Sequence, residues 1–292
     1  MAEAYALHEG AFGTAIVLEA GANLVSHAHS ETHLALWLGG VRACAHVGEE
    51  TVIYGENVAL GVNAFEAHDM VLLEEPGSCL FLVFLISQPW LQARAHESHR
   101  SFRFQSPTVY IDGAMRRSCW RVLDRILAGG TPKKELDNEV EALLLAAIDG
   151  TQGLGHLSTP TGPMLDHRLR RAIAHMREQV DKTSGIDDIA AKVGLSRAHF
   201  FSLFREQLNT TPHVFWSGVR IEEAMRRVSQ GEVLTEVALD LGFTAPGNFS
   251  RFFKEHTGVS PSKFQRAAGN HSPVTVTGIP RLKSPRIPAP VR

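Results

Sequence analysis

The chain has 292 residues, of which 44% are hydrophobic and 21% are charged, enough for about two domains that each bury a core. The start of the chain lacks a basic region followed by an apolar run, and its most apolar run, residues 79–86, is far shorter than the roughly 20 residues of a membrane-spanning helix. The three cysteines, Cys44, Cys79 and Cys119, are too widely spaced to indicate a disulfide framework or a thiolate zinc site. We therefore expect a cytoplasmic protein without a membrane partner.

The net charge of -2 conceals two halves of opposite sign. Residues 1–163 contain 10 Lys and Arg against 19 Asp and Glu, whereas residues 164–292 contain 19 against 12. The second half would attract a polyanion and the first half would repel it. This asymmetry predicts a nucleic-acid-binding domain joined to a domain with another task.

Short apolar runs separated by Gly, Asn and Glu turns fill residues 11–86, among them 14–18, 34–38 and 80–85. Runs of this length predict an antiparallel sandwich or barrel rather than helices. We assign residues 1–106 to this unit and expect an α+β fold for the whole chain.

Four histidines form the one constellation in the first half that could carry chemistry: His27, His29, His33 and His68. The segment from Gly21 to Gly40 resembles the first cupin motif, with His33 where that motif usually has Glu, and His68 stands where the second motif places its histidine. This resemblance implies a cupin-like antiparallel β-barrel. Side chains at i and i+2 of a strand point the same way, and a third histidine from a facing strand could complete an imidazole site for zinc, nickel or copper.

Two further uses of these histidines stay open. The first, which we favour, is a pocket for a small-molecule effector, lined by the four histidines and Trp37. The second is a cupin metalloenzyme, although an enzyme would not explain the attached nucleic-acid-binding half that the charge asymmetry predicts. The proline and glycine of the second cupin motif are missing, with Ala64 and Phe65 in their places. We expect no catalytic residue and no certain cofactor, and a divalent metal remains the alternative ligand.

The apolar spacing becomes helical after Pro107. One stripe runs from Ile111 to Ile126 and ends at Gly129-Gly130, and a second follows Thr131-Pro132, a capping residue with proline at the first helical position. Residues 107–150 are thus predicted to form an antiparallel helix pair, which either covers the sheet or forms a homodimer interface. Residues 151–163 have the composition of a flexible linker.

One motif is written twice between residues 185 and 266. In the first copy Ile186, Ile189, Ala190 and Val193 form the buried face of a short helix, and Leu234, Val237, Ala238 and Leu241 repeat it in the second. Gly194 and Gly242 end these helices in tight turns, after which Ser196 and Thr244 can cap the next helix. This is the layout of a helix-turn-helix. Residues 215–228, between the copies, predict a connecting helix that would place both units on successive major-groove segments.

The outer face of each second helix is the predicted DNA-reading surface. Arg donates two bonds to guanine and Asn pairs with adenine, whereas Ala and Phe contact only thymine methyl groups or sugar. The second copy is therefore better equipped for polar base readout. The two faces consist of Arg197, Ala198, Phe201, Ser202 and Arg205 in the first copy, and of Gly247, Asn248, Ser250, Arg251 and Lys254 in the second.

About 100 residues of this half resemble the AraC/XylS-type transcription regulators. The resemblance implies a seven-helix DNA-binding domain, here residues 164–268, that binds promoter DNA and commonly activates transcription by contacting RNA polymerase. Beyond it, residues 269–292 are rich in proline and basic residues and predict a disordered tail. The matching residues are Ile189-Ala190, Gly194-Leu-Ser196, Phe200, Leu203-Phe204 and Thr211-Pro212, and then Glu236-Val-Ala238, Leu241-Gly-Phe243, Asn248-Phe-Ser-Arg251, Phe252-Phe-Lys254, Gly258-Val-Ser-Pro261 and Phe264.

Overall fold

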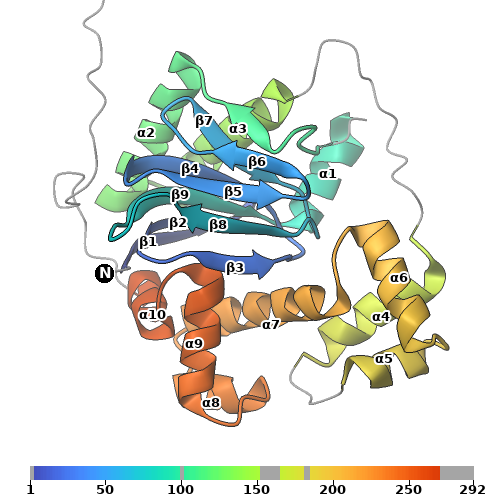
Figure 1. Cartoon of the computed structure of the whole chain (residues 1–292). Coiled ribbons are helices and arrows are strands. Elements are labelled where there is room, and N and C mark those ends of the chain that lie inside the picture. The colour runs from blue at the N-terminus through green and yellow to red at the C-terminus, as the bar shows by residue number, and fades with distance from the viewer. Residues whose placement is uncertain (1–2, 99–101, 152–164, 181–184, 270–292) are drawn as a thin grey trace, which may run out of the picture.

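The computed structural model describes residues 3–98, 102–151, 165–180 and 185–269, as two β-sheets followed by a helical half (Figure 1). The predicted linker at 151–163, apart from Thr151, and the predicted tail at 269–292, apart from Gly269, lie outside the described residues. None of the described helices has the length and apolarity that a membrane span requires.

All strand pairs of the N-terminal half are antiparallel. The six-stranded sheet has the order β1 (Glu3–Gly10), β2 (Gly13–Ala20), β9 (Cys79–Ile86), β4 (Thr32–Gly40), β7 (Val58–Val62) and β10 (Thr108–Tyr110). The four-stranded sheet has the order β3 (Leu24–His27), β8 (His68–Leu72), β5 (Ala43–Val47) and β6 (Glu50–Ile53). The α+β class is confirmed, but among the described strands the hydrogen-bonded ladders form two sheets and do not close the expected barrel.

Strand β9 lies at the centre of the larger sheet, between β2 and β4, and its residues are nearly all buried. Its side chains alternate between two apolar clusters, because successive residues of a strand point to opposite faces. Leu82 and Phe84 face the helices that cover the outside of the sheet, whereas Phe81 and Leu85 face the second sheet and the C-terminal half.

Three helices belong to the N-terminal half: α1 (Gln88–Ser98), α2 (Gly113–Ala128) and α3 (Lys133–Gly150). The sequence did not predict α1 or the short strand β10. Because β10 ends at Tyr110 and α2 begins at Gly113, Ile111 precedes the helix in which it was predicted to lie. Asp112 caps α2 by accepting a bond from the Met115 amide at 2.7 Å. Helix α3 begins one residue later than predicted, with Pro132 rather than Thr131 at the capping position.

The apolar stripes of α2 and α3 are buried against the six-stranded sheet and each other. The stripes therefore cover the sheet, which was one of their two predicted roles. Dimerisation through the remaining faces of these helices stays a prediction.

The C-terminal half is helical: α4 (His167–Glu178), α5 (Ile186–Lys192), α6 (Arg197–Leu208), α7 (Pro212–Ser229), α8 (Leu234–Asp240), α9 (Pro246–Thr257) and α10 (Pro261–Gly269). Gly194 and Gly242 adopt φ of 73° and 77°, the left-handed conformation that the predicted turns require. Ser196 caps α6 as expected, but Thr244 does not cap α9, because the chain enters that helix at Ala245 without a side-chain cap.

The two halves pack directly against each other, chiefly where α7, α9 and α10 meet β1 and β3 (Figure 1). One apolar cluster includes both Ile16 and Phe81 from the sheet and both Ile221 and Phe253 from the helices. Polar contacts join the same elements, including a 2.7 Å ion pair between Lys263 and Glu3. The sequence pattern did not indicate that the two halves share a core.

The closest approach between the halves is at Gly218 of α7. A Cβ atom at this position would lie 1.5 Å from the carbonyl oxygen of Ala28. The neighbouring Ser30 donates from its backbone N–H and its hydroxyl to the carboxylate of Glu222, one turn further along α7. Glycine thus lets α7 lie against the backbone of residues 28–30, hereafter the docking segment.

We predict that Gly218→Ala lowers the free energy of unfolding by about 1–3 kcal/mol, because the methyl group has no room against a backbone carbonyl. Urea unfolding of the full chain measures the change. Gly150→Ala, at the end of α3 with open space around its Cβ position, is the matched control and should cost nothing. Equal stability of Gly218→Ala and the control would contradict this account of the junction.

Candidate nucleic-acid interface and histidine cluster

The predicted reading face of α6 is on the surface, because Phe200, Leu203 and Phe204 turn the opposite face into the core. Of its five residues, Arg197, Ala198 and Arg205 are exposed, and Phe201 and Ser202 are half-buried.

Two polar side chains of this face are engaged within the protein. Arg197 forms an ion pair with Asp187 and lies over the Phe201 ring, 4.8 Å from its centroid. Ser202 donates to Glu206 at 2.5 Å. DNA would have to compete with two carboxylates for these groups.

The reading face of α9 is more open. Gly247, Asn248, Ser250, Arg251 and Lys254 are all exposed, while Phe249 and Phe253 are buried behind them. Among the described residues, these side chains make one hydrogen bond, a long contact of 3.4 Å from the Asn248 amide to the Thr244 hydroxyl. The polar side chains of this set therefore lie exposed on one helix face, and their role in reading DNA stays a prediction.

Helix α7 holds both units. On the first unit, Phe215 packs edge-on against Phe204 of α6 with ring centroids 5.4 Å apart. On the second, Arg220 donates to the carbonyl of Leu241 at 2.5 Å and lies 4.2 Å from the ring centroid of Phe243, in the turn between α8 and α9. Sequence reasoning missed Arg220, because its partners are more than 20 residues away along the chain.

The four predicted histidines converge on one point between the sheets. All are at least 92% buried, and their ring centroids lie 4.3 Å (His27 to His68), 4.5 Å (His33 to His68) and 5.2 Å (His29 to His33) apart. A fifth imidazole, His256 of α9, lies 5.8 Å from His27. Periodicity offered no signal for His256, since it belongs to a different half of the chain.

Hydrogen bonds set the orientation of the rings. Nδ1 of His27 lies 2.8 Å from the Val25 carbonyl and Nδ1 of His68 lies 2.9 Å from the Glu66 carbonyl. Because a carbonyl only accepts, both Nδ1 atoms must donate, which leaves the Nε2 lone pairs of His27 and His68 unprotonated. Nε2 of His29 bonds Nδ1 of His33 at 3.1 Å.

Burial keeps these rings neutral. Desolvation, followed by repulsion from a neighbouring imidazole, lowers the pKa of His29 and of His68 to about 3. The same causes hold the pKa values of His27 and His33 well below their ordinary value. The cluster thus presents neutral nitrogen lone pairs instead of positive charge.

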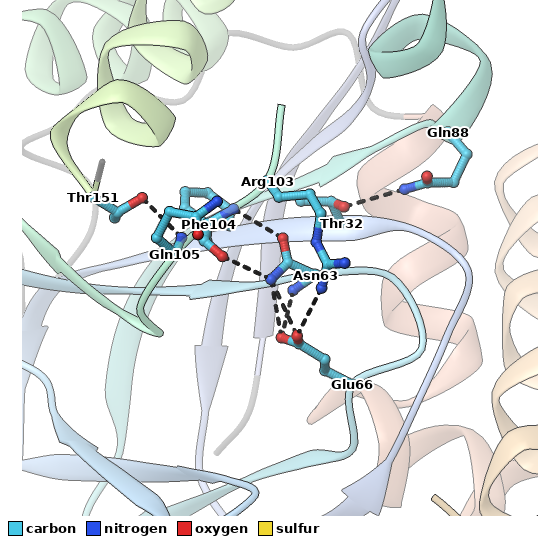
Figure 2. A network of polar contacts seen from close by, with 8 residues as sticks. All are labelled: Thr32, Asn63, Glu66, Gln88, Arg103, Phe104, Gln105 and Thr151. Atoms are coloured by element: carbon cyan, nitrogen blue, oxygen red, sulfur yellow. Dashed lines mark hydrogen bonds and ion pairs between the residues drawn. The ribbon is translucent and has the colours of Figure 1, made fainter. Parts of the chain in front are cut away.

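Hydrogen bonds and an ion pair tie residues 63–66, in the turn just before β8 and His68, to residues 103 and 104 (Figure 2). The Asn63 side chain accepts from the Phe104 amide at 2.9 Å and donates to the Phe104 carbonyl at 3.0 Å. The Glu66 carboxylate accepts from the Asn63 amide at 3.1 Å and pairs with Arg103 at 3.4 Å. Between them, Phe65 adopts a left-handed φ of 68° and stacks on Phe215 of α7, 5.2 Å away. Residues 63–66 therefore orient His68 and also contact the C-terminal half.

A cavity opens beside the cluster, with about 850 Å³ of empty volume, part of it open to solvent. Trp37 is not among the lining residues, because its indole packs elsewhere and donates to the Val41 carbonyl at 3.2 Å. The lining combines apolar side chains of both sheets with the four histidines, Glu31, and residues of the helical half that include Ile221, Glu222, Met225, His256 and Phe264.

We predict that acid destabilises the fold through these rings. Between pH 6.5 and about 3, His29 and His68 are protonated in the unfolded chain but stay neutral in the folded protein. Unfolding therefore takes up protons, and the free energy of unfolding falls as the pH falls. Each such histidine adds about 1.4 kcal/mol per pH unit to the slope. Urea unfolding between pH 7 and 5, with a chelator present, should give a shallower slope for His68→Gln than for the wild type. Parallel slopes would contradict the prediction.

Comparison with known proteins gives results for the C-terminal half and for the overall fold. A helix-turn-helix domain model matches residues 189–267. The raffinose operon transcriptional regulatory protein RafR of Pediococcus pentosaceus is 28% identical over 99 residues, 34% of this chain and 36% of that protein. The arabinose operon regulatory protein of Escherichia coli is 31% identical over 130 residues, 44% of this chain and 42% of that protein. The chain thus spans about a third to a half of the length of these curated relatives.

The solved structure of ToxT from Vibrio cholerae superposes with a TM-score of 0.57 at 11% identity, and the match covers 87% of this chain and 97% of ToxT. This likeness shows that the two proteins share a fold, including the N-terminal sheets. Residues 189–267 therefore form a helix-turn-helix domain, and about a third to two fifths of the chain is similar in sequence to regulators of sugar operons.

Proposed function

We propose that the chain is a sequence-specific DNA-binding transcription regulator whose α6 and α9 enter successive major-groove segments of promoter DNA. The observation that carries the proposal is that α6 and α9, joined by the single helix α7, each present their predicted reading face on the surface. Both lie in the half of the chain with a positive charge balance. The residues proposed to contact DNA are Arg197, Ala198, Phe201, Ser202 and Arg205 on α6, and Gly247, Asn248, Ser250, Arg251 and Lys254 on α9. The helix-turn-helix domain of residues 189–267 argues against the cupin-enzyme alternative.

The two helices divide the work. Arg251 and Asn248 of α9 are exposed and suited to read guanine and adenine. On α6, the ion pair of Arg197 and the apolar Ala198 and Phe201 favour contacts that supply position and affinity. Phosphate contacts from Arg205 and Lys254 would add to binding without reading sequence.

The cavity between the sheets and the helices is the proposed effector site. A structure of ToxT contains a bound unsaturated fatty acid, so a protein of this fold holds an apolar ligand. Here the described lining residues include imidazoles and carboxyl groups but no Lys or Arg. This chemistry favours an effector that is apolar and carries a hydrogen-bond donor over one with a free carboxylate. Because α7, α9 and α10 form part of the wall, a ligand there would bias how the reading helices are held.

Three partners complete the proposal. RNA polymerase would be contacted on activated promoters, as the family resemblance implies. A second copy of the chain would pair through the outer faces of α2 and α3, whose inner faces are used by the sheet. The protein would act in the cytoplasm, where promoter DNA is found.

We predict that Arg251→Ala weakens binding to the selected site by about 1–3 kcal/mol and relaxes base preference at one position. The site is first obtained by selecting DNA fragments that the full chain retains, and affinity is then measured on that site and on single-base variants. Arg42→Ala, the same charge change at an exposed position between β4 and β5, is the control and should leave affinity unchanged.

Uniform weakening on every sequence would make Arg251 a phosphate contact and would reject its role in readout. If the full chain retained no DNA fragment above background at low salt, the proposed function itself would fail.

A further inference from the structure

The histidine cluster contains ring nitrogens that the protein leaves without a partner. Nε2 of His68 and Nδ1 of His29 are buried and make no hydrogen bond. An unpaired buried polar atom lowers stability, because the hydrogen bond that it made to water in the unfolded chain is not replaced. A ligand that accepts the lone pairs of two such atoms would remove this cost. We propose that His27, His29 and His68 bind a divalent transition-metal ion, and that this ion controls how the DNA-binding half docks on the sheets.

The three imidazoles have the geometry of an apo site. One nitrogen from each lies within 4.8 Å of the others. Metal–nitrogen bonds of about 2.1 Å in a tetrahedral site place ligand nitrogens about 3.4 Å from one another. Binding would therefore draw the nitrogens closer by up to about 1.4 Å. His27 and His68 are paired residues of β3 and β8, whereas His29 follows β3 and lies in the docking segment.

The hydrogen bonds made by the other ring nitrogens favour the same assignment. Metal-bound imidazoles usually donate their other N–H to a carbonyl or carboxylate, which fixes the tautomer and orients the ring. His27 and His68 do this already, through Val25 and Glu66. His33, bonded to Nε2 of His29, is a positioning residue that presents Nδ1 of His29 to the ion.

The chemistry of the ligand atoms narrows the choice of metal ion. Neutral imidazoles without a thiolate suit Zn²⁺, Ni²⁺, Co²⁺ or Cu²⁺, whereas Mg²⁺ and Ca²⁺ require oxygen ligands. Three protein ligands leave a coordination position free. Because these histidines line the cavity, that position is available to water or to a donor atom of an effector.

One proposed ligand, His29, lies on the docking segment that α7 contacts, and a second, His27, directly precedes it. His27 and His29 flank Ala28, whose carbonyl touches Gly218, and Ser30 follows with its two bonds to Glu222. The ring of His256, on the proposed sequence-reading helix α9, lies 5.8 Å from the ring of His27, measured between centroids. Contraction of the rings would thus move the docking segment against both helices. This coupling rests on the proposed DNA-binding function, whereas metal binding does not.

The first experiment measures metal alone. The full chain, stripped with a chelator, is titrated with Co²⁺ and followed by visible absorption, and bound Zn²⁺ is counted after desalting. We expect one equivalent for the wild type, none for His68→Gln, and binding about 10–100-fold weaker for His33→Gln. His96→Gln, an exposed histidine of α1, is the control and should bind like the wild type. Circular dichroism and thermal unfolding of the chelated proteins verify that each variant folds.

A wild type that binds less than a tenth of an equivalent of either ion would overturn the metal site. So would folded His68→Gln that binds as the wild type does, because the ion would then lie elsewhere.

The second experiment measures coupling, on the DNA site selected with metal-free protein. Zn²⁺ should change the affinity of the wild type for that site by about fivefold or more, in line with typical coupling between sites. Glu222→Gln should keep one equivalent of Zn²⁺ but show a smaller change, since it weakens the grip of α7 on Ser30. Stoichiometric Zn²⁺ with unchanged DNA affinity would overturn the control of docking while leaving the proposed function standing, whereas absence of DNA binding in all states would reject the function instead.

Discussion

The contact on which the structure depends is that between α7 and the docking segment. Gly218 permits an approach that any Cβ atom would block, and the Glu222 carboxylate then accepts both donors of Ser30. Desolvation raises the pKa of Glu222 even though these bonds and Arg177 oppose the shift. Burial, and after it the nearby Glu222 carboxylate, raises the pKa of Glu31 to about 8. The junction therefore combines close backbone packing with carboxyl groups that are partly withdrawn from water.

Both reading helices are held by that same helix. Phe215 near its start packs on α6, and Arg220 in its middle anchors the turn before α9. A shift of α7 on the sheets would carry both units with it. The two units are nevertheless unequal, since Asp187 and Glu206 occupy polar groups of the first face while the second presents its groups to solvent.

The histidines show how a polar cluster persists within an apolar interior. Each ring is neutral, so the cost of burial is that of unmet hydrogen bonds and not of charge. The network of Asn63 and Glu66 holds the His68 turn rigid, and Phe65, left-handed within that turn, also packs on the helical half. The same few residues thus orient the cluster and form part of the junction.

Much of the helical half was predictable from the sequence because its determinants are local. Apolar spacing within seven or eight residues, Gly194 and Gly242 at the turns, and Ser196 at a cap were enough to locate both helix-turn-helix units and to place Arg251 on an outer face. Alternation of apolar residues likewise predicted most of the strands. It wrongly placed His27 and His29 on one strand, because β3 ends at His27 and His29 follows it. Local signals were weaker where tertiary contacts decided the outcome, as at β10, at α1 and at the uncapped start of α9.

What the sequence by itself determined was most of the helices and strands, the group of four histidines, and the ten residues on the outer faces of α6 and α9. Only the tertiary structure decided that the strands form two sheets, that Trp37 lies away from the cavity, and that the helical half shares a core with the sheets. It alone brought His256, Glu222 and Gly218 to the histidine cluster. The physical reason is that these contacts join residues about 190 or more positions apart, and their geometry depends on the packing of whole surfaces, which no periodicity along the chain encodes.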